Sequence, residues 1–365
     1  QLCIRECLKT GDRIRVIVIG TGPFFEAPDK EAVAALAYAH EQGINYADFA
    51  TAGAETFRYA GMAFASVRKE MFYQVHFGAN YETGEYGWTT SLDKVKRQVD
   101  WQLKELKTDY IDFGFIHCLD SEDDWKQYQK NGVLDYLLEM KKSGVVRYIG
   151  LSTHTPELAQ KILDTGLIEQ LMFSINPAYD YQHGEFAFGS ADERMKLYRR
   201  CEAEGIGISV MKPYSGGQLL DERTSPFGKA LTEAQCIQYA LDKPGVLTVL
   251  PGVRNLDDVK RALSWLTAAP EEKDYSALGG YAPKDAVGNC VYCSHCHPCP
   301  AGLNIALINK YYDLAVIGDS MAADHYEKLP KHASDCIGCG HCDRRCPFHV
   351  AQSERIKEIA AYFGK

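Results

Sequence analysis

The sequence predicts an α/β chain that forms a (β/α)8 barrel (a TIM barrel) followed by a small second domain. From Arg13 onward, apolar β-rich segments alternate eight times with helix-period segments over about 270 residues, which is the count and size of that barrel. After Thr267 the alternation stops, and two dense runs of cysteine follow. We expect the barrel to span residues 1–275 and the cysteine-rich domain to span residues 276–365.

Each barrel element is expected from its own local pattern. The strands are expected over Arg15–Ile19, Asn45–Asp48, Phe72–Phe77, Ile111–His117, Arg147–Ser152, Leu171–Ile175, Gly207–Met211 and Val246–Leu250. The helices are expected over Asp29–Gln42, Ala54–Arg68, Ser91–Leu106, Asp124–Ser143, Pro156–Thr165, Ala191–Glu204, Thr232–Leu241 and Leu256–Thr267. Glycines such as Gly43 and Gly205 mark helix ends. A doubly wound open sheet is the alternative, but no G-x-G-x-x-G motif follows the first strand.

The cysteines of the tail fall into two runs, each ending in Cys-Pro. The first run has C-x2-C-x2-C-x2-C spacing and the second has C-x2-C-x2-C-x3-C spacing, with members Cys290, Cys293, Cys296 and Cys299, then Cys336, Cys339, Cys342 and Cys346. The second spacing is that of bacterial ferredoxins, so the runs predict two [4Fe–4S] clusters in a ferredoxin-like domain of loops and helices. By analogy with two-cluster ferredoxins, each fourth cysteine is expected to serve the other cluster, which pairs Cys346 with the first run and Cys299 with the second.

Zinc and disulfides are the alternatives for these cysteines. Zinc sites pair C-x2-C knuckles across a longer loop, whereas three C-x2-C steps place too many thiolates on one loop. Disulfides need an oxidising compartment. The histidines inside the runs are expected to be solvated or to donate hydrogen bonds to sulfur: His295, His297 and His341.

The composition narrows the setting of the protein. The formal net charge of -9 argues against nucleic acid or an anionic membrane surface as a partner. No apolar run approaches the length of a membrane span, and no signal-like apolar segment opens the chain. Thirteen cysteines, eight of them expected as metal ligands, indicate a reducing compartment, so we expect a cytoplasmic protein.

Functional residues of a barrel gather at the carboxyl ends of its strands. The chemistry-bearing residues at those positions are Asp48, His76, His117, Ser152, Thr153, Asn176, Lys212 and the turn Pro251-Gly252-Val253-Arg254. Several segments here resemble the aldo-keto reductase family: L-K-T-G-D-R-I-R-V-I-V-I-G-T-G, G-I-N-Y-A-D, D-Y-I-D-F-G-F-I-H, G-L-S-T-H, G-I-G-I-S-V-M-K-P and V-L-P-G-V. The cysteine tail resembles the ferredoxin-like extension of the iron–sulfur branch of that family. The resemblance therefore implies an oxidoreductase.

The resemblance implies four catalytic groups, and this chain keeps two of them. Asp48 and His117 match the family's aspartate and histidine. The family's lysine position is occupied by His76, and its tyrosine position falls on Gly53, so the usual general acid is missing. This departure argues against ordinary carbonyl reduction.

We hypothesise that His117, assisted by an Asp48–His76 pair, donates a proton to the substrate. The competing interpretation is that His76 fills the space of a lost lysine in a barrel without hydride chemistry. Three tyrosines are candidate replacement acids: Tyr46, Tyr59 and Tyr81. Cys118 is expected to point away from the mouth and pack under a helix, because neighbours along a strand face opposite sides.

The resemblance also implies NADP or NAD lying across the barrel mouth. Ser152 and Asn176 correspond to the carboxamide region, and the expected phosphate region comprises Lys212, Pro251, Gly252 and Arg254. Because hydride donors move two electrons and cubanes move one, a flavin stays open as an intermediary.

Three functions follow from this set of residues. The first is an iron–sulfur oxidoreductase that binds a small molecule at the barrel mouth and receives electrons through its two clusters from a ferredoxin-type donor or a nicotinamide. The second is an NAD(P)H-dependent carbonyl reductase whose clusters are structural. The third is an electron-transfer subunit without catalysis.

Overall fold

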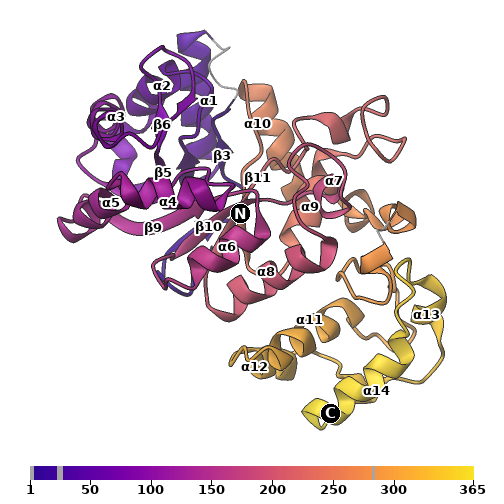
Figure 1. The fold of residues 1–365 in the computed structure, drawn as a ribbon. Helices are drawn as coiled ribbons and strands as arrows, with labels where there is room; N and C mark the ends of the chain where they lie inside the picture. Colours follow the sequence, from indigo (N-terminus) through magenta and orange to yellow (C-terminus); the bar gives the residue numbers. More distant parts are fainter. Residues whose placement is uncertain (1–3, 23–27, 282–283) are drawn as a thin grey trace.

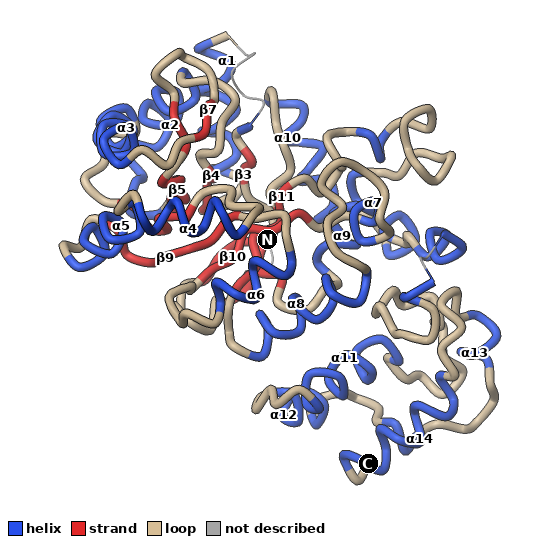
Figure 2. Tube along the Cα trace, viewed as in Figure 1, coloured by secondary structure: helices blue, strands red, loops and turns tan. Residues whose placement is uncertain are grey.

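A computed structural model describes residues 4–22, 28–281 and 284–365. Its centre is a parallel eight-stranded sheet (Figures 1 and 2), whose strands are β3 (Ile19–Gly20), β4 (Tyr46–Asp48), β5 (Phe72–Phe77), β8 (Ile111–Ile116), β9 (Val146–Ser152), β10 (Gln170–Ser174), β11 (Gly207–Met211) and β12 (Val246–Val249). The first and last strands also meet, through parallel bridges between Ile17 and Val249 and between Gly20 and Gly252. The sheet therefore curls into the predicted barrel, and the predicted fold class is confirmed.

Helices cover the outside of this sheet, one or two after each strand. They are α1 (Asp29–Glu41), α2 (Glu55–Phe64), α3 (Leu92–Glu105), α4 (Glu122–Lys130), α5 (Val133–Lys142), α6 (Pro156–Leu163), α7 (Pro177–Asp180), α8 (Ala191–Ala203), α9 (Glu233–Leu241) and α10 (Leu256–Leu263). Ser121, Ser190 and Thr232 form capping boxes at α4, α8 and α9, because each hydroxyl accepts from the third helical amide.

Three details differ from the sequence-based expectation. Arg13–Arg15 forms β2, which pairs antiparallel with β1 (Ile4–Glu6), so the first barrel strand is shorter than predicted. The single helix expected over Asp124–Ser143 is two helices, α4 and α5, separated at Gly132 with φ 78°. The loop after β5 contains an antiparallel hairpin of β6 (Ala79–Asn80) and β7 (Gly87–Trp88). Turn geometry that needs a positive φ explains the last two differences.

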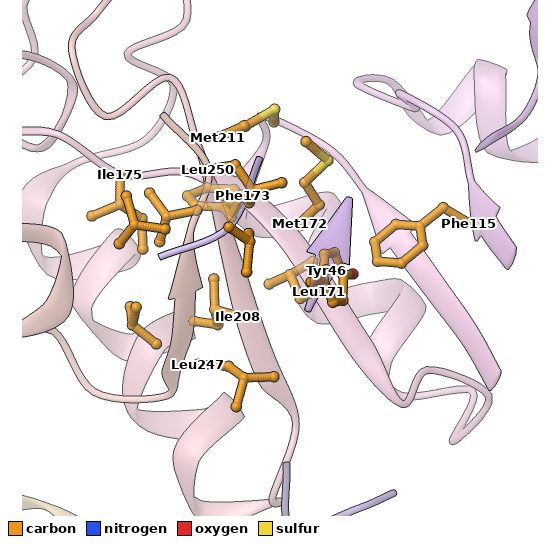
Figure 3. Close-up of a cluster of buried hydrophobic side chains, with 14 of the residues drawn as sticks. Tyr46, Phe115, Leu171, Met172, Phe173, Ile175, Ile208, Met211, Leu247 and Leu250 are labelled. Atoms are coloured by element: carbon orange, nitrogen blue, oxygen red, sulfur yellow. The ribbon is translucent and has the colours of Figure 1, made fainter. Parts of the chain in front are cut away.

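Buried hydrophobic side chains cover both faces of the barrel strands (Figure 3), and Phe173 packs outward against Tyr198 of α8. Leu171, Phe173, Ile208 and Leu247 are each at most 3% exposed. Met172 and Leu250 belong to the same cluster in Figure 3 and also line the cavity above it. Below this cavity the barrel interior is filled by the fully buried side chains of Tyr46, Gln74 and Gln170, which bond one another, so a ligand reaches the strand ends from the mouth.

The tail packs beside α8 rather than over the barrel mouth (Figure 1). It follows a linker of short 3-10 helices between Ser264 and Ala286, and its helices are α11 (Ile305–Val316), α12 (Ala322–Glu327), α13 (His341–Arg345) and α14 (Gln352–Phe363). Arg199 of α8 bonds Asp313 of α11 at 3.2 Å and the hydroxyl of Tyr292 at 3.0 Å. These contacts hold the first cysteine run against the barrel. In the part of the chain that the structure describes, no helix is long and apolar enough to cross a membrane.

Replacing Gly61 with alanine tests how closely α2 packs against α3. Helix α2 follows β4, the strand that carries Asp48. A Cβ atom at Gly61 would lie 2.0 Å from the carbonyl oxygen of Glu105, so α2 and α3 must separate. We expect Gly61→Ala to destabilise the fold by about 1–3 kcal/mol, seen as a lower thermal midpoint by circular dichroism. Gly280→Ala is the control, because no atom lies within 4 Å of its added Cβ. Equal midpoints for the two variants would contradict the packing described.

Candidate active site and cysteine sets

Four side chains at the barrel mouth form a continuous chain of hydrogen bonds. Asp48 Oδ1 lies 2.7 Å from His76 Nε2, His76 Nδ1 lies 2.9 Å from His117 Nδ1, and His117 Nε2 lies 2.7 Å from the Tyr86 hydroxyl. The structure thus brings together the three predicted catalytic residues and adds a tyrosine. Every ring nitrogen of the two histidines has a partner, so the chain can move a proton along its length.

The inner members of this chain are shielded from water. Asp48, His76 and His117 are each at most 3% exposed. Gln74, two residues before His76 on the same face of β5, donates to Asp48 Oδ1 at 2.9 Å and fixes the carboxylate. Burial, followed by the charges of His76 and His154, lowers the pKa of His117 well below its usual range. His117 is therefore neutral at neutral pH.

Tyr86 reaches His117 from the β6–β7 hairpin, and sequence reasoning missed it. The hairpin turns at Gly84, whose φ is 89°, and the returning strand carries Tyr86 over the mouth. Tyr86 is 42% exposed, so its ring borders the open cavity. Burial, then the charge of Cys118, raises the pKa of Tyr86, so its hydroxyl keeps its proton. The signal in the sequence was a glycine turn between two aromatic pairs after the third strand.

The three tyrosines proposed as replacement acids are elsewhere. Tyr46 is buried under the mouth and bonds the side chain of Gln74. Tyr59 bonds Asp29 at 2.7 Å on the outer helices. The Tyr81 hydroxyl bonds the backbone of Thr51 at 3.0 Å. None of the three contacts His117 through its hydroxyl, whereas Tyr86 does.

A cavity of about 1340 Å³ opens above the chain of hydrogen bonds. Most of the predicted cofactor-binding residues line it, namely Ser152, Lys212, Pro251, Gly252 and Arg254. Asn176 does not line it, because its side chain accepts from the Tyr179 amide at 2.9 Å and donates to the Lys212 carbonyl at 2.9 Å. Asn176 thus caps α7 in this structure. The Arg254 guanidinium is bonded to Asp258 at 2.9 Å.

A second polar cluster lies on the same wall of the cavity. His154 Nδ1 is 2.9 Å from Asp120 Oδ2, and His154 Nε2 is 3.1 Å from Lys212 Nζ. Burial lowers the pKa of Lys212, which also lies 3.2 Å from the centre of the Phe186 ring. The pKa of Asp120 is lowered. Burial acts in the opposite direction, but the hydrogen bonds to His154 and Thr153 and the charge of His154 together outweigh it.

The expectation that Cys118 packs under a helix is wrong. Strand β8 ends at Ile116, and Cys118 has a φ of 48°, so the alternation of faces stops before it. Cys118 lines the cavity with His117, and its sulfur is 3.9 Å from Asp120 Oδ2. The distances among three ligand atoms here would allow a metal ion, because the atoms of Cys118, Asp120 and His154 lie within 4.8 Å of one another. The ammonium of Lys212 on the far side of His154 disfavours a second cation there.

The second cysteine set surrounds a small enclosed space in the tail. Its members are Cys299, Cys336, Cys339 and Cys342, and all four line the same pocket. The remaining walls are largely apolar, with Leu303, Ile305, Ile337 and Ile356 among them. Cys299 belongs to the first run in sequence, so the second run obtains its fourth thiol from the other run.

The first cysteine set faces the barrel. Burial raises the pKa of Cys296, and the neighbouring thiols of Cys290, Cys293 and Cys346 raise it further. Cys346 is thus the second-run cysteine that lies with the first run. Cys290, Cys293 and Cys346 also pack against the hydrophobic core of the barrel. These four converging thiols form no disulfide, and they are the donor set that a cubane cluster needs.

Histidines inside the two runs have buried ring nitrogens without a protein partner. Among the described residues these orphan atoms include His295 Nδ1, His297 Nε2 and His341 Nε2. A buried unpaired nitrogen is costly, and the sulfurs of a bound cluster would supply acceptors. The residues present therefore fit an iron–sulfur cluster at each set.

The neutral state of His117 predicts how stability depends on pH. The unfolded chain protonates this histidine near pH 6.5, whereas the folded state resists protonation, so unfolding is favoured as pH falls below that value. His117→Gln removes this dependence on pH. Below pH 6.5 the free energy of unfolding of the variant therefore rises relative to that of wild type, by up to about 1.4 kcal/mol per pH unit. Anaerobic urea unfolding at pH 7.5 and 5.5 measures it, with exposed His183→Gln as control. Parallel pH curves for wild type and His117→Gln would contradict the assignment.

Comparisons with known proteins agree with this architecture. Residues 16–235 match the aldo/keto reductase family, and residues 286–350 match a 4Fe-4S dicluster domain. The uncharacterized oxidoreductase YqkF of Bacillus subtilis is 24% identical over 279 residues, covering 70% of this chain and 89% of the relative. L-glyceraldehyde 3-phosphate reductase of Escherichia coli K12 is 23% identical over 288 residues, covering 73% of this chain and 80% of the relative.

Solved structures show the same barrel. The holo form of aldo-keto reductase AKR11C1 from Bacillus halodurans superimposes with a TM-score of 0.61 at 22% identity, covering 78% of this chain and 97% of that one. The apo form of Gox0644 superimposes with a TM-score of 0.54 at 20% identity, and the match covers 78% of this chain and 95% of Gox0644. With the barrel, the mouth residues and the cysteine tail in place, this chain belongs to the aldo/keto reductase family and is an oxidoreductase with a 4Fe-4S dicluster domain at its carboxyl end.

Proposed function

We propose that this oxidoreductase interconverts a carbonyl and a hydroxyl group of a small molecule in the barrel cavity, with Tyr86 exchanging the proton. The hydrogen-bonded chain from Asp48 to Tyr86 carries this proposal. In it, Tyr86 replaces the acid that is missing at Gly53, and His76 takes over the place of the family's lysine. The proposed catalytic residues are Asp48, His76, His117 and Tyr86.

Two proton arrangements of this chain satisfy every nitrogen, and they differ by one proton. In the first, His76 carries two protons, donating to Asp48 and to His117, while His117 donates to the Tyr86 oxygen. The Tyr86 hydroxyl is then free to donate to a substrate oxygen. In the second, His76 donates only to Asp48, His117 donates to His76, and Tyr86 donates to His117. Passing from the first to the second releases one proton at the Tyr86 end.

This arrangement explains how a buried proton donor can work in both directions. Reduction of a carbonyl to an alcohol takes two electrons and two protons. The chain supplies the proton that reaches the oxygen, and a hydride carrier bound in the cavity would supply both electrons together with the hydrogen that reaches the carbon. Oxidation uses the second arrangement, in which His117 receives the proton that Tyr86 takes from the alcohol. Asp48 accepts a hydrogen bond from His76 in both arrangements, and this contact favours the first arrangement, in which His76 holds two protons.

We further propose that the eight tail cysteines ligate two [4Fe–4S] clusters in the two sets described above, within a domain that begins near residue 276. When bound, such clusters carry single electrons. The exposed Cys339 in the second set and the barrel contact of the first set favour a path from a ferredoxin-type carrier, through the second cluster and then the first, to the barrel.

A nicotinamide-dependent reductase with structural clusters is the second candidate. The cavity of about 1340 Å³ favours it, because that volume exceeds what a small substrate needs. We propose Ser152, Lys212, Pro251, Gly252 and Arg254 as its cofactor contacts. Anaerobic mixing with NADPH separates the two functions: loss of cluster absorbance indicates that electrons reach the clusters, and NADPH consumption with unchanged cluster absorbance indicates the reductase. If neither NADPH nor a reduced ferredoxin supports turnover, the proposed function is wrong.

Tyr86→Phe tests the proton donor. We expect turnover to fall by about 10²- to 10⁴-fold with KM little changed, because the substitution removes the hydroxyl and keeps the ring. Activity is measured against a panel of aldehydes and ketones. Tyr59→Phe removes an equivalent hydroxyl on the outer helices and should leave turnover unchanged. Full activity of Tyr86→Phe would exclude the proposed role.

Cys299→Ser tests the exchange of the fourth cysteines. Loss of this thiol should remove the second cluster while the first persists, so iron falls from about eight to about four per chain in anaerobic protein. The buried thiol of Cys201, which belongs to neither set, provides the control Cys201→Ser. To identify the lost cluster, the same count is made in Cys336→Ser and in the double variant. A double variant with less iron than either single variant would contradict the exchange.

A further inference from the structure

A buried lysine lies where the barrel meets the first cysteine set. Lys243 follows α9 and precedes β12, and it is 1% exposed. Its ammonium is 3.4 Å from the carbonyl oxygen of Val291, which lies between the first two cysteines of the first run. The same ammonium lies 3.8 Å from the centre of the Tyr239 ring. Lys243 therefore belongs to the seam between the two domains.

The carboxylates near Lys243 are bonded to other groups. Asp180 accepts from Arg194 at 2.7 Å and from Tyr239 at 2.8 Å. Asp242 accepts from the Tyr275 hydroxyl at 2.7 Å and from a side-chain amide. Among the side chains that the structure describes, no carboxylate oxygen is within 4 Å of the Lys243 ammonium. A buried ammonium without a close anion is costly, so the site lacks a negative group.

The first cysteine set is in the right place to supply that group. Val291, whose carbonyl oxygen contacts the Lys243 ammonium, lies between Cys290 and Cys293. Burial lowers the pKa of Lys243, and the charges that oppose this shift are those of Asp180, Asp242, Cys293 and Cys290. A cubane with four thiolate ligands carries net negative charge, and the ring faces of Tyr239 and Tyr275 also favour a cation. We propose that Lys243 is the counter-ion of the first cluster and holds its reduction potential above the value it would otherwise have. This proposal rests on the ligand sets proposed above.

The second cysteine set has a different electrostatic environment. Its neighbouring cation Arg344 is exposed and donates to the carbonyl oxygen of Cys339, whereas Arg345, which is also exposed, donates to the carbonyl oxygen of His295 in the first run. Water screens exposed charges, whereas the buried ammonium of Lys243 interacts with the first set without such screening. The charge of Lys243 thus raises the reduction potential of the cluster beside the barrel relative to that of the other cluster.

The test compares reduction potentials in anaerobic full-length protein. Lys243→Met keeps the length of the side chain and removes its charge, whereas Lys243→Arg keeps the charge. Lys310→Met is the matched control, because Lys310 lies at the same seam but is paired with Glu202 at 3.3 Å. Midpoint potentials come from redox titrations followed by electron paramagnetic resonance.

In Lys243→Met we expect one of the two potentials to fall by about 59 mV or more, which is a tenfold change in a one-electron equilibrium. The other potential should not move, and Lys243→Arg and Lys310→Met should resemble wild type. If Lys243→Met loses four irons while Lys243→Arg keeps about eight, the charge is needed for assembly, and the proposal stands. Unchanged potentials in Lys243→Met, or loss of the cluster from both Lys243 variants, would overturn it. Wild-type protein without cluster signals would instead refute the ligand sets.

Discussion

The contact between Asp48 and His76 is the interaction on which the barrel mouth depends. A carboxylate that is 3% exposed needs a partner, and the 2.7 Å bond to His76 provides one. That bond occupies one ring nitrogen and turns the other toward His117, which in turn faces Tyr86. The orientation of each group therefore follows from the one before it. A histidine can transmit direction in this way because it has two nitrogens on opposite sides of a rigid ring, whereas a lysine has one.

Much of the fold could be predicted because its signals are local. Alternating strand and helix patterns indicate the barrel, and cysteine spacing indicates the dicluster tail confirmed by the family match. The functional site was harder to predict from the sequence, because it depends on backbone conformation. Tyr86 reaches the mouth through a hairpin that turns at Gly84, and Cys118 faces the cavity because its φ is positive. Neither conformation follows from periodicity. Asn176 illustrates the same limit, as its position at a strand end did not reveal that it caps α7.

The two parts of the molecule share one seam. Arg199 joins α8 to the tail through Asp313, and Cys290, Cys293 and Cys346 of the first set pack on the barrel core. Cys299, Cys336 and Cys342 of the second set pack in a separate small core with α11 and α14, which also includes Cys296 of the first set. This arrangement gives the two sets unequal surroundings, one between domains and one near solvent. The barrel is thus joined to a tail whose first cysteine set packs partly against it.

The exposure of the second cysteine set also affects how the protein tolerates air. Cys339 is exposed, and its neighbour Ile337 is 66% exposed, so dissolved dioxygen can approach the sulfur ligands from that side. In the first set Cys296 is buried and the other three cysteines are half-buried, so dioxygen would reach this set more slowly. With clusters bound at the two proposed ligand sets, oxidative damage would therefore begin at the outer set and leave a protein that still holds its inner cluster. Loss of activity in air and loss of structure in air would then be separate events.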